Sequence, residues 1–174
     1  MLKKFQNPID KPFNPCYNKD TPRGKELIRM KIWFDMDGTI ADLYAVEGWL
    51  EMLRAFDPAP YEMAKPMHHM ATLARMMNRA QAMGHELCII SWCSKTSTPD
   101  YDEAVKQAKL AWLAKHLPSV HWDDVEIVPY GQDKWETCGE GILFDDEAKN
   151  REGWANGEAF TPDEIKRILS ALCK

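Results

Sequence analysis

The sequence predicts an α/β protein built on a doubly wound parallel sheet, and two observations lead to this prediction. Short apolar runs of strand length alternate along the chain with longer segments of helical periodicity. Several of these runs end directly in acidic or hydroxyl side chains, at residues 32–37, 87–91 and 142–146. Because parallel sheets of this architecture bind ligands beyond the carboxyl ends of their strands, these polar residues predict one shared site.

The size and composition of the chain favour one soluble domain. Its 174 residues are enough for one substantial core and too few for two domains of typical size. No apolar run approaches the roughly 20 residues that span a bilayer, and the N-terminus lacks the apolar region of a signal peptide. We therefore expect a cytoplasmic protein that has no membrane partner.

Charge and cysteine content restrict the function further. A net charge of -5 argues against general nucleic-acid binding, which usually requires a basic surface, although Lys95, Lys134 and Lys149 leave a local basic patch open. The five cysteines are scattered and form no Cys-x-x-Cys pair, so we expect free thiols and no zinc site. They stand at positions 16, 88, 93, 138 and 173.

The first 29 residues are predicted to be an irregular arm that precedes a domain of residues 30–174. This segment contains Pro8, Pro12, Pro15 and Pro22 and has neither helical nor strand periodicity.

The first predicted strand, residues 32–34, runs into the sequence Asp35-Met36-Asp37-Gly38-Thr39. Side chains of a strand alternate, so Asp35 and Asp37 start on the same side, and Gly38 lets the chain turn sharply. Two carboxylates so close together repel each other unless a cation lies between them, and Mg²⁺ prefers such oxygen ligands. The alternative interpretation is an ordinary polar turn after a strand.

Two helices are expected between the first strand and the second. Residues 45–56 carry the apolar stripe of an amphipathic helix, which the run from Asp57 to Pro60 ends. A short piece at residues 61–65 leads to a helix over residues 66–83, and Gly84 is placed as its stop.

The apolar run of residues 86–91 predicts a second buried strand, which ends at Ser91. A polar loop begins at Trp92, and Asp100 with Glu103 forms a capping-box-like start for a helix that reaches residue 117. Val105, Ala108, Trp112 and His116 share one face of this helix.

The remaining elements repeat this alternation. A strand over residues 125–128 precedes a loop with Lys134, and an apolar strand from residue 141 runs into Asp145 and Asp146. The acidic pair can also be explained as a cap of the next helix, residues 147–154. A brief strand at residues 159–160 precedes a last helix, which a capping box of Thr161 and Glu164 starts.

Four of these features resemble, in order, the four motifs of the haloacid dehalogenase-like phosphatase superfamily. They are the Asp35-to-Thr39 string, Ser91 at a strand end, Lys134 in a loop, and Asp145-Asp146 after an apolar strand. The resemblance implies a Rossmann-like core with a small helical cap inserted after the first strand, at about residues 41–66.

The resemblance also implies a chemistry for each motif. Asp35 attacks phosphorus, Asp37 acts as general acid and base, and Ser91 and Lys134 contact the phosphoryl group. Mg²⁺ is held by Asp35, the backbone carbonyl of Asp37 and Asp145, with Asp146 in support. We further expect Gly38, Thr39 and Trp92 to contact the substrate.

Within the superfamily, residues 144–154 and the Lys134-to-Asp145 spacing resemble the 5'(3')-deoxyribonucleotidase-like group, which implies a nucleotide substrate. Tyr44, Trp49 or Trp92 can stack on a base, although Trp49 also fits a core position. The short cap, Trp92 after the second motif and the N-terminal arm depart from that group. A sugar phosphate, a nucleic-acid 3'-end and a non-catalytic binding module remain alternatives.

Overall fold

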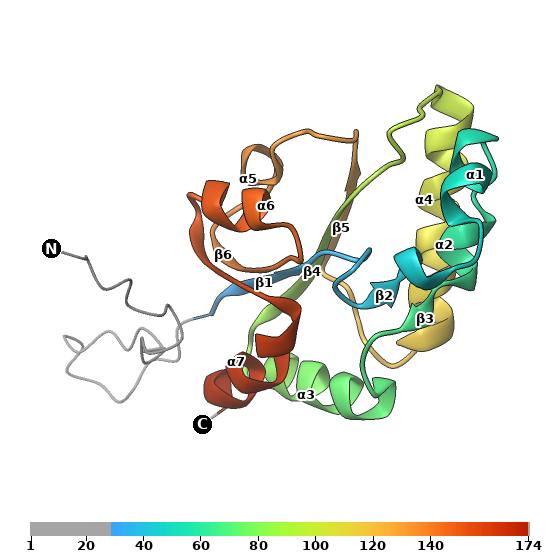
Figure 1. Ribbon diagram of the computed structural model, residues 1–174. Helices are drawn as coiled ribbons and strands as arrows, with labels where there is room; N and C mark the ends of the chain where they lie inside the picture. The colour runs from blue at the N-terminus through green and yellow to red at the C-terminus, as the bar shows by residue number, and fades with distance from the viewer. Residues whose placement is uncertain (1–28, 174) are drawn as a thin grey trace, which may run out of the picture.

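A parallel sheet forms the centre of the protein (Figure 1). The computed structural model describes residues 29–173, and within them five strands pair in the order β5-β4-β1-β6-β7, all parallel. The strands are β1 (Lys31–Phe34), β4 (Glu86–Trp92), β5 (Asp124–Val128), β6 (Gly141–Phe144) and β7 (Gly157–Phe160). This arrangement confirms the predicted fold class.

Helices cover both faces of the sheet because the strand side chains alternate between two cores. Ile32 and Phe34 of β1 join the larger core with α3 (Met70–Ala82), α4 (Pro99–His116) and α7 (Ile165–Leu172). Trp33, between them, points to the opposite face, where α6 (Ala148–Gly153) contributes its C-terminal neighbour Trp154 to a second core. A short helix, α5 (Lys134–Thr137), lies before β6.

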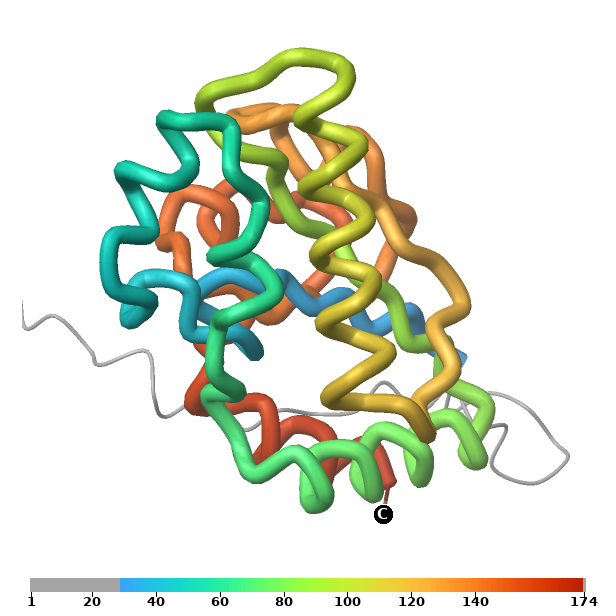
Figure 2. Tube along the Cα trace, turned by 90° about the vertical axis from the view of Figure 1, so that its right-hand side faces the viewer, coloured from blue at the N-terminus to red at the C-terminus, as the bar shows by residue number. Residues whose placement is uncertain are grey.

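The segment between β1 and α3 projects from the central sheet. Its ends pair as two antiparallel strands, β2 (Ala41–Asp42) and β3 (Lys65–Pro66). Between them lie the 3-10 turn η2 (Leu43–Ala45), α1 (Trp49–Arg54) and α2 (Ala59–Met63). We call residues 41–66 the insertion. It lies against α4 (Figures 1 and 2), where Leu53 and Tyr61 pack with Val105.

The structure corrects several predicted boundaries in and beside the insertion. The helix expected over residues 45–56 is split into η2 and α1, because Gly48 takes a left-handed conformation with φ 70°. The expected turn at residues 57–60 instead begins α2, whose first turn tolerates the missing N–H of Pro60. The next helix starts at Met70, since Lys65 and Pro66 pair with β2.

Helix capping was predicted correctly at one helix and wrongly at another. Helix α4 begins at Pro99, and its cap is Thr98, whose hydroxyl oxygen accepts from the N–H of Tyr101 at 3.2 Å. The capping box at the C-terminal helix is confirmed, with the N–H of Thr161 donating to Glu164 at 3.1 Å. It starts η3 (Pro162–Glu164), which α7 follows directly.

Three other expectations concern the chain as a whole. The N-terminal arm lies outside the described residues except for Arg29, as does Cys16. The cysteines at positions 88, 93, 138 and 173 are buried and free. Among the residues that the structure describes, no helix has the length and apolar character needed to cross a membrane.

Candidate active site

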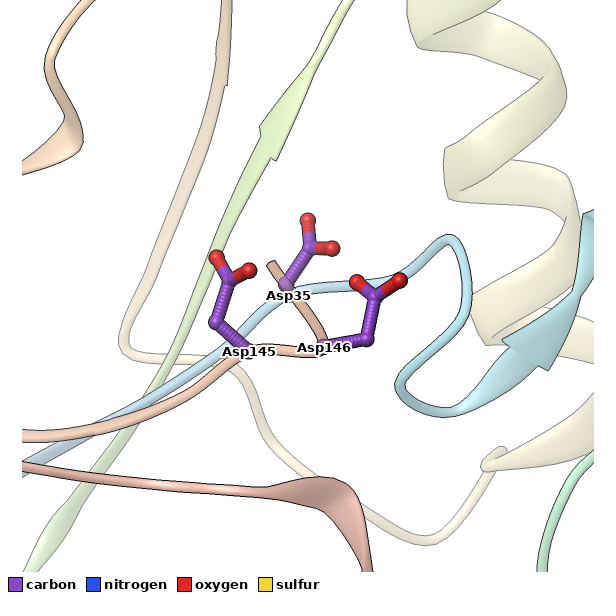
Figure 3. Close-up of side chains that lie close together, drawn as sticks. All are labelled: Asp35, Asp145 and Asp146. Carbon is purple, nitrogen blue, oxygen red and sulfur yellow. The ribbon is translucent and has the colours of Figure 1, made fainter. Parts of the chain in front are cut away.

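Three carboxylates meet where β1 and β6 end (Figure 3). Asp35 follows β1 directly, and Asp145 and Asp146 follow β6, its neighbour in the sheet. Each offers an oxygen atom within 4.8 Å of the others. The parallel register, which pairs Phe34 with Phe144, brings the acidic residues after both strands to the same level.

This cluster fits a hard divalent cation. Asp35 and Asp145 are buried, and Oδ1 of Asp146 is buried without a hydrogen-bond partner. Burial, and then repulsion from the neighbouring carboxylates, raises the pKa of Asp145 to about 6 and that of Asp146 to about 7. A cation such as Mg²⁺ would offset both shifts by favouring the ionised carboxylates, and it would satisfy the unpaired oxygen atom. Asp37 is expected to contact the metal through its backbone carbonyl, and its side chain lies outside this cluster and pairs with Lys109.

The structure holds Asp145 in place with side chains of α6. The amide of Asn150 donates to both carboxylate oxygens of Asp145, at 3.0 and 3.2 Å. The guanidinium of Arg151 donates to the backbone carbonyls of Asp145 and Asp146, at 2.8 and 2.6 Å. Neither residue was singled out from the sequence, and their position one turn after the acidic pair is the signal that could have identified them.

Gly38 and Thr39 lie beside Asp146 and do not line the cavity, so their expected contact with substrate stays a prediction. The hydroxyl oxygen of the buried Thr39 accepts from the N–H of Asp146 at 3.1 Å. The N–H of Gly38 is used by the carbonyl of Ala41 at 2.8 Å. A Cβ at Gly38, where φ is +78°, would overlap the Asp146 carboxylate, so the glycine allows that side chain to reach the cluster.

Lys134, at the start of α5, neutralises two of the carboxylates. Its ammonium lies 2.9 Å from Asp35 and 2.6 Å from Asp145, and its side chain is 2% exposed. Burial lowers the pKa of Lys134, but the two carboxylates outweigh this effect and raise it above its ordinary value. The ammonium also lies 5.1 Å from the ring centre of Trp92, a cation–π contact.

Asp37 and Ser91 are joined by a residue that the sequence analysis missed. The ammonium of Lys109 donates to Oδ2 of Asp37 at 2.5 Å and to Oγ of Ser91 at 2.7 Å. Burial raises the pKa of Asp37 above its ordinary value, although Lys109 opposes the shift. Lys109 follows Val105 and precedes Trp112 on the apolar stripe of α4, and a charged residue on such a stripe was the available signal.

A cavity of about 450 Å³ opens above these groups. Asp35, Asp37, Asp146 and Lys134 lie at its polar end. Fifteen other residues line its walls; seven of them belong to the insertion, and Ser94, Thr96, Glu147 and Asn150 supply polar or acidic groups. The fifteen also include Leu43, Tyr44, Trp49, Leu50, Leu53, Tyr61, Trp92 and Tyr130, with Arg54 and Lys95 as additional cations.

Two of the three lysines of the basic patch that the sequence left open, Lys95 and Lys134, line the cavity, and Lys149 does not. Lys95 lines the cavity and is exposed, whereas Lys134 is buried among carboxylates. The side chain of Lys149 is 71% exposed and lies 3.9 Å from Asp133.

Comparisons with known proteins support the fold. No family model matches the chain, and no curated protein matches it. Among solved structures it is similar to D,D-heptose 1,7-bisphosphate phosphatase from Burkholderia thailandensis, with a TM-score of 0.51 and 9% sequence identity. The likeness covers 82% of this chain and 97% of that chain. At this identity it confirms the α/β fold, and it gives no support to the deoxyribonucleotidase-like subgroup.

Proposed function

We propose that this protein is a Mg²⁺-dependent phosphoric monoester hydrolase that works through an aspartyl phosphate. The observation that carries the proposal is the placement of Asp35. Its carboxylate lies at the polar end of the cavity, 2.9 Å from an ammonium group and within the carboxylate cluster that fits a metal ion.

The reaction would take two steps. In the first, an oxygen of Asp35 attacks phosphorus, the bond to the ester oxygen breaks, and Asp37 donates a proton to the departing alcohol. In the second, Asp37 takes a proton from water as that water attacks the aspartyl phosphate, which releases phosphate and restores Asp35. Mg²⁺, held by Asp35, Asp145 and Asp146 and by the backbone carbonyl of Asp37, would reduce repulsion between the nucleophile and the phosphate dianion.

The remaining residues of the site would bind and orient the substrate. Lys134 touches the nucleophile and is placed to attract the phosphoryl oxygens. Ser91, expected to contact the phosphoryl group, is 0% exposed and does not line the cavity, so it would act by holding Lys109. The insertion would act as a small cap, because it supplies six of the eight leucine, tryptophan and tyrosine side chains that line the cavity.

For the substrate we propose a nucleoside monophosphate. Trp49, Trp92 and Tyr44 line the cavity, and a base needs flat apolar walls of this kind. A sugar phosphate is the second candidate, since the similar solved structure is described as a D,D-heptose 1,7-bisphosphate phosphatase. Polar lining residues such as Ser94 and Asn150 could bind a sugar, but the aromatic rings on the walls favour the nucleotide.

Phosphate release from nucleoside monophosphates, sugar phosphates and a 3'-phosphorylated oligonucleotide tests the proposal. Turnover should need Mg²⁺, stop with EDTA and return when Mg²⁺ is restored. Activity that persists in chelator would overturn the metal dependence. A chain that hydrolyses none of these esters would instead be a non-catalytic binding module.

The variant Trp49→Ala tests the nucleotide assignment. Loss of a stacked base should raise KM for a nucleoside monophosphate by roughly 5- to 150-fold, the equivalent of about 1 to 3 kcal/mol. Glycerol phosphate has no ring, so its KM should change little. Equal effects on both substrates would mean that Trp49 supports the insertion and does not bind a base.

A further inference from the structure

A second buried ammonium group, that of Lys109, lies beneath the candidate site. Lys109 is in the middle of α4 and is 0% exposed. Its ammonium contacts Asp37 and Ser91 and lies 4.8 Å from the ring centre of Tyr61, a residue of the insertion. It therefore joins three parts of the chain that are distant in sequence: the loop after β1, the strand β4 and the insertion.

The two buried lysines of the site contact different carboxylates. Lys134 bonds to Asp35 and Asp145, which belong to the proposed nucleophile and metal cluster. Lys109 bonds to Asp37, the proposed acid and base. Separate cations therefore contact the proposed nucleophile and the proposed proton donor.

The donor-only chemistry of an ammonium group determines what its partners can do. One oxygen of Asp37, Oδ2, is occupied by Lys109, which leaves Oδ1 for proton transfer. Ser91 must accept from Lys109, so its own hydrogen is left for another acceptor. Ser91 is 0% exposed and does not line the cavity, so its role here is to anchor Lys109 beneath the site.

We propose that Lys109, anchored by Ser91, is a positioning residue that fixes the Asp37 carboxylate for proton transfer. The assignment rests on the proposed phosphatase function. A purely structural alternative exists, in which the buried pair only fastens α4 to the sheet. The two differ because a structural contact affects every substrate equally, whereas a fault in proton transfer depends on the leaving group.

The test compares Lys109→Met with Lys106→Met. Methionine keeps an apolar chain of similar length without donors, and Lys106 is an exposed lysine of the same helix. On an alkyl phosphate, whose leaving group needs a proton, Lys109→Met should lose roughly 100-fold or more in kcat, the scale of general acid–base catalysis. Lys106→Met should match the wild type.

p-Nitrophenyl phosphate supplies the readout that a structural role would not change. Its leaving group departs without protonation, so Lys109→Met should still release a burst of about one nitrophenolate per enzyme before slow steady turnover. Equal losses on both substrates with no burst would overturn the proposal. Lys109→Arg keeps the charge and the donors, and it should recover part of the alkyl phosphate activity if the proposal holds.

Combining Lys109→Met with Asp37→Asn provides an independent check. If Lys109 acts through Asp37, the second substitution should add little to the first in alkyl phosphate turnover. Additive losses would contradict the proposal. If Lys109→Met does not fold, as thermal denaturation would show, Lys109→Arg with Asp37→Asn serves for the same comparison. A wild-type chain without phosphatase activity would refute the proposed function, whereas an active wild type and an unaffected Lys109→Met would refute only this inference.

Discussion

The substitution Lys134→Met tests the electrostatics of the carboxylate cluster most directly. It removes a buried ammonium that lies 2.9 Å from Asp35 and 2.6 Å from Asp145. The partner side chains are 7% and 0% exposed, so water cannot replace the lost charge. Both carboxylates would be left without their shared counter-ion.

The expected loss of stability follows from this burial. Breaking a buried ion pair by removing one partner costs about 3 to 5 kcal/mol. For a domain of this size each kcal/mol shifts Tm by roughly 2 to 4 °C, so the lower figure corresponds to a fall of about 6 to 12 °C. Thermal denaturation in EDTA measures it. Added Mg²⁺ should reduce the deficit, because the cation supplies positive charge to the same carboxylates.

Lys149→Met is the matched control. It also removes a lysine paired with an aspartate, but its side chain is 71% exposed and the pair distance is 3.9 Å. Exposed pairs contribute about 0 to 1 kcal/mol, so Tm should change by only a few degrees. Equal Tm values for the two variants would refute the reasoning that Lys134 is the counter-ion of the cluster.

Three other predictions use the same site and the core. Asp35→Asn should abolish both turnover and the trapping of a phosphoenzyme, whereas Asp37→Asn should still be phosphorylated by p-nitrophenyl phosphate. A phosphoenzyme trapped on Asp35→Asn would exclude Asp35 as the nucleophile. Gly38→Ala should weaken Mg²⁺ binding by displacing Asp146, and calorimetric titration with an unchanged affinity would contradict this. Burial holds the pKa of His85 below 6.5, so its stabilisation is present above pH 6.5 and is lost as the pH falls through its lowered pKa. The Tm of the wild type should therefore decline more steeply between pH 7 and pH 5 than that of His85→Gln, and parallel curves would refute it.

The sheet and much of the site could be predicted because their signals are local. Each strand of the sheet that borders the site is an apolar run, and the polar residues after it are read directly from the sequence. Asp35, Asp145 and Lys134 meet in the structure because parallel strands end at one edge. The two aspartates are about 110 residues apart in the sequence, so spacing alone does not predict their proximity. The parallel sheet brings them together.

The errors arise where tertiary contacts override local pattern. An apolar stripe at residues 45–56 predicted one helix, but Gly48 and the packing of the insertion on α4 divide it. The cavity walls come from side chains of separate elements, so their aromatic character could not be read from spacing. Lys109 is the clearest omission. A single lysine on a helix is usually solvated, and only its neighbours Val105 and Trp112 indicate burial.

Lys109 contributes a second buried positive charge to the site. Among the described residues, the carboxylates of the site are Asp35, Asp37, Asp145 and Asp146, and the ammonium groups that touch them are those of Lys109 and Lys134. With Asp37 protonated, as the proposed first step requires, their formal charges leave an excess of one negative charge, and one divalent cation would make the cluster positive. A phosphate dianion would then approach a positive site. Without both lysines it would meet a net negative charge in a largely buried site, where repulsion is poorly screened. Both lysines therefore favour anion binding, although only Lys134 lies on the cavity wall.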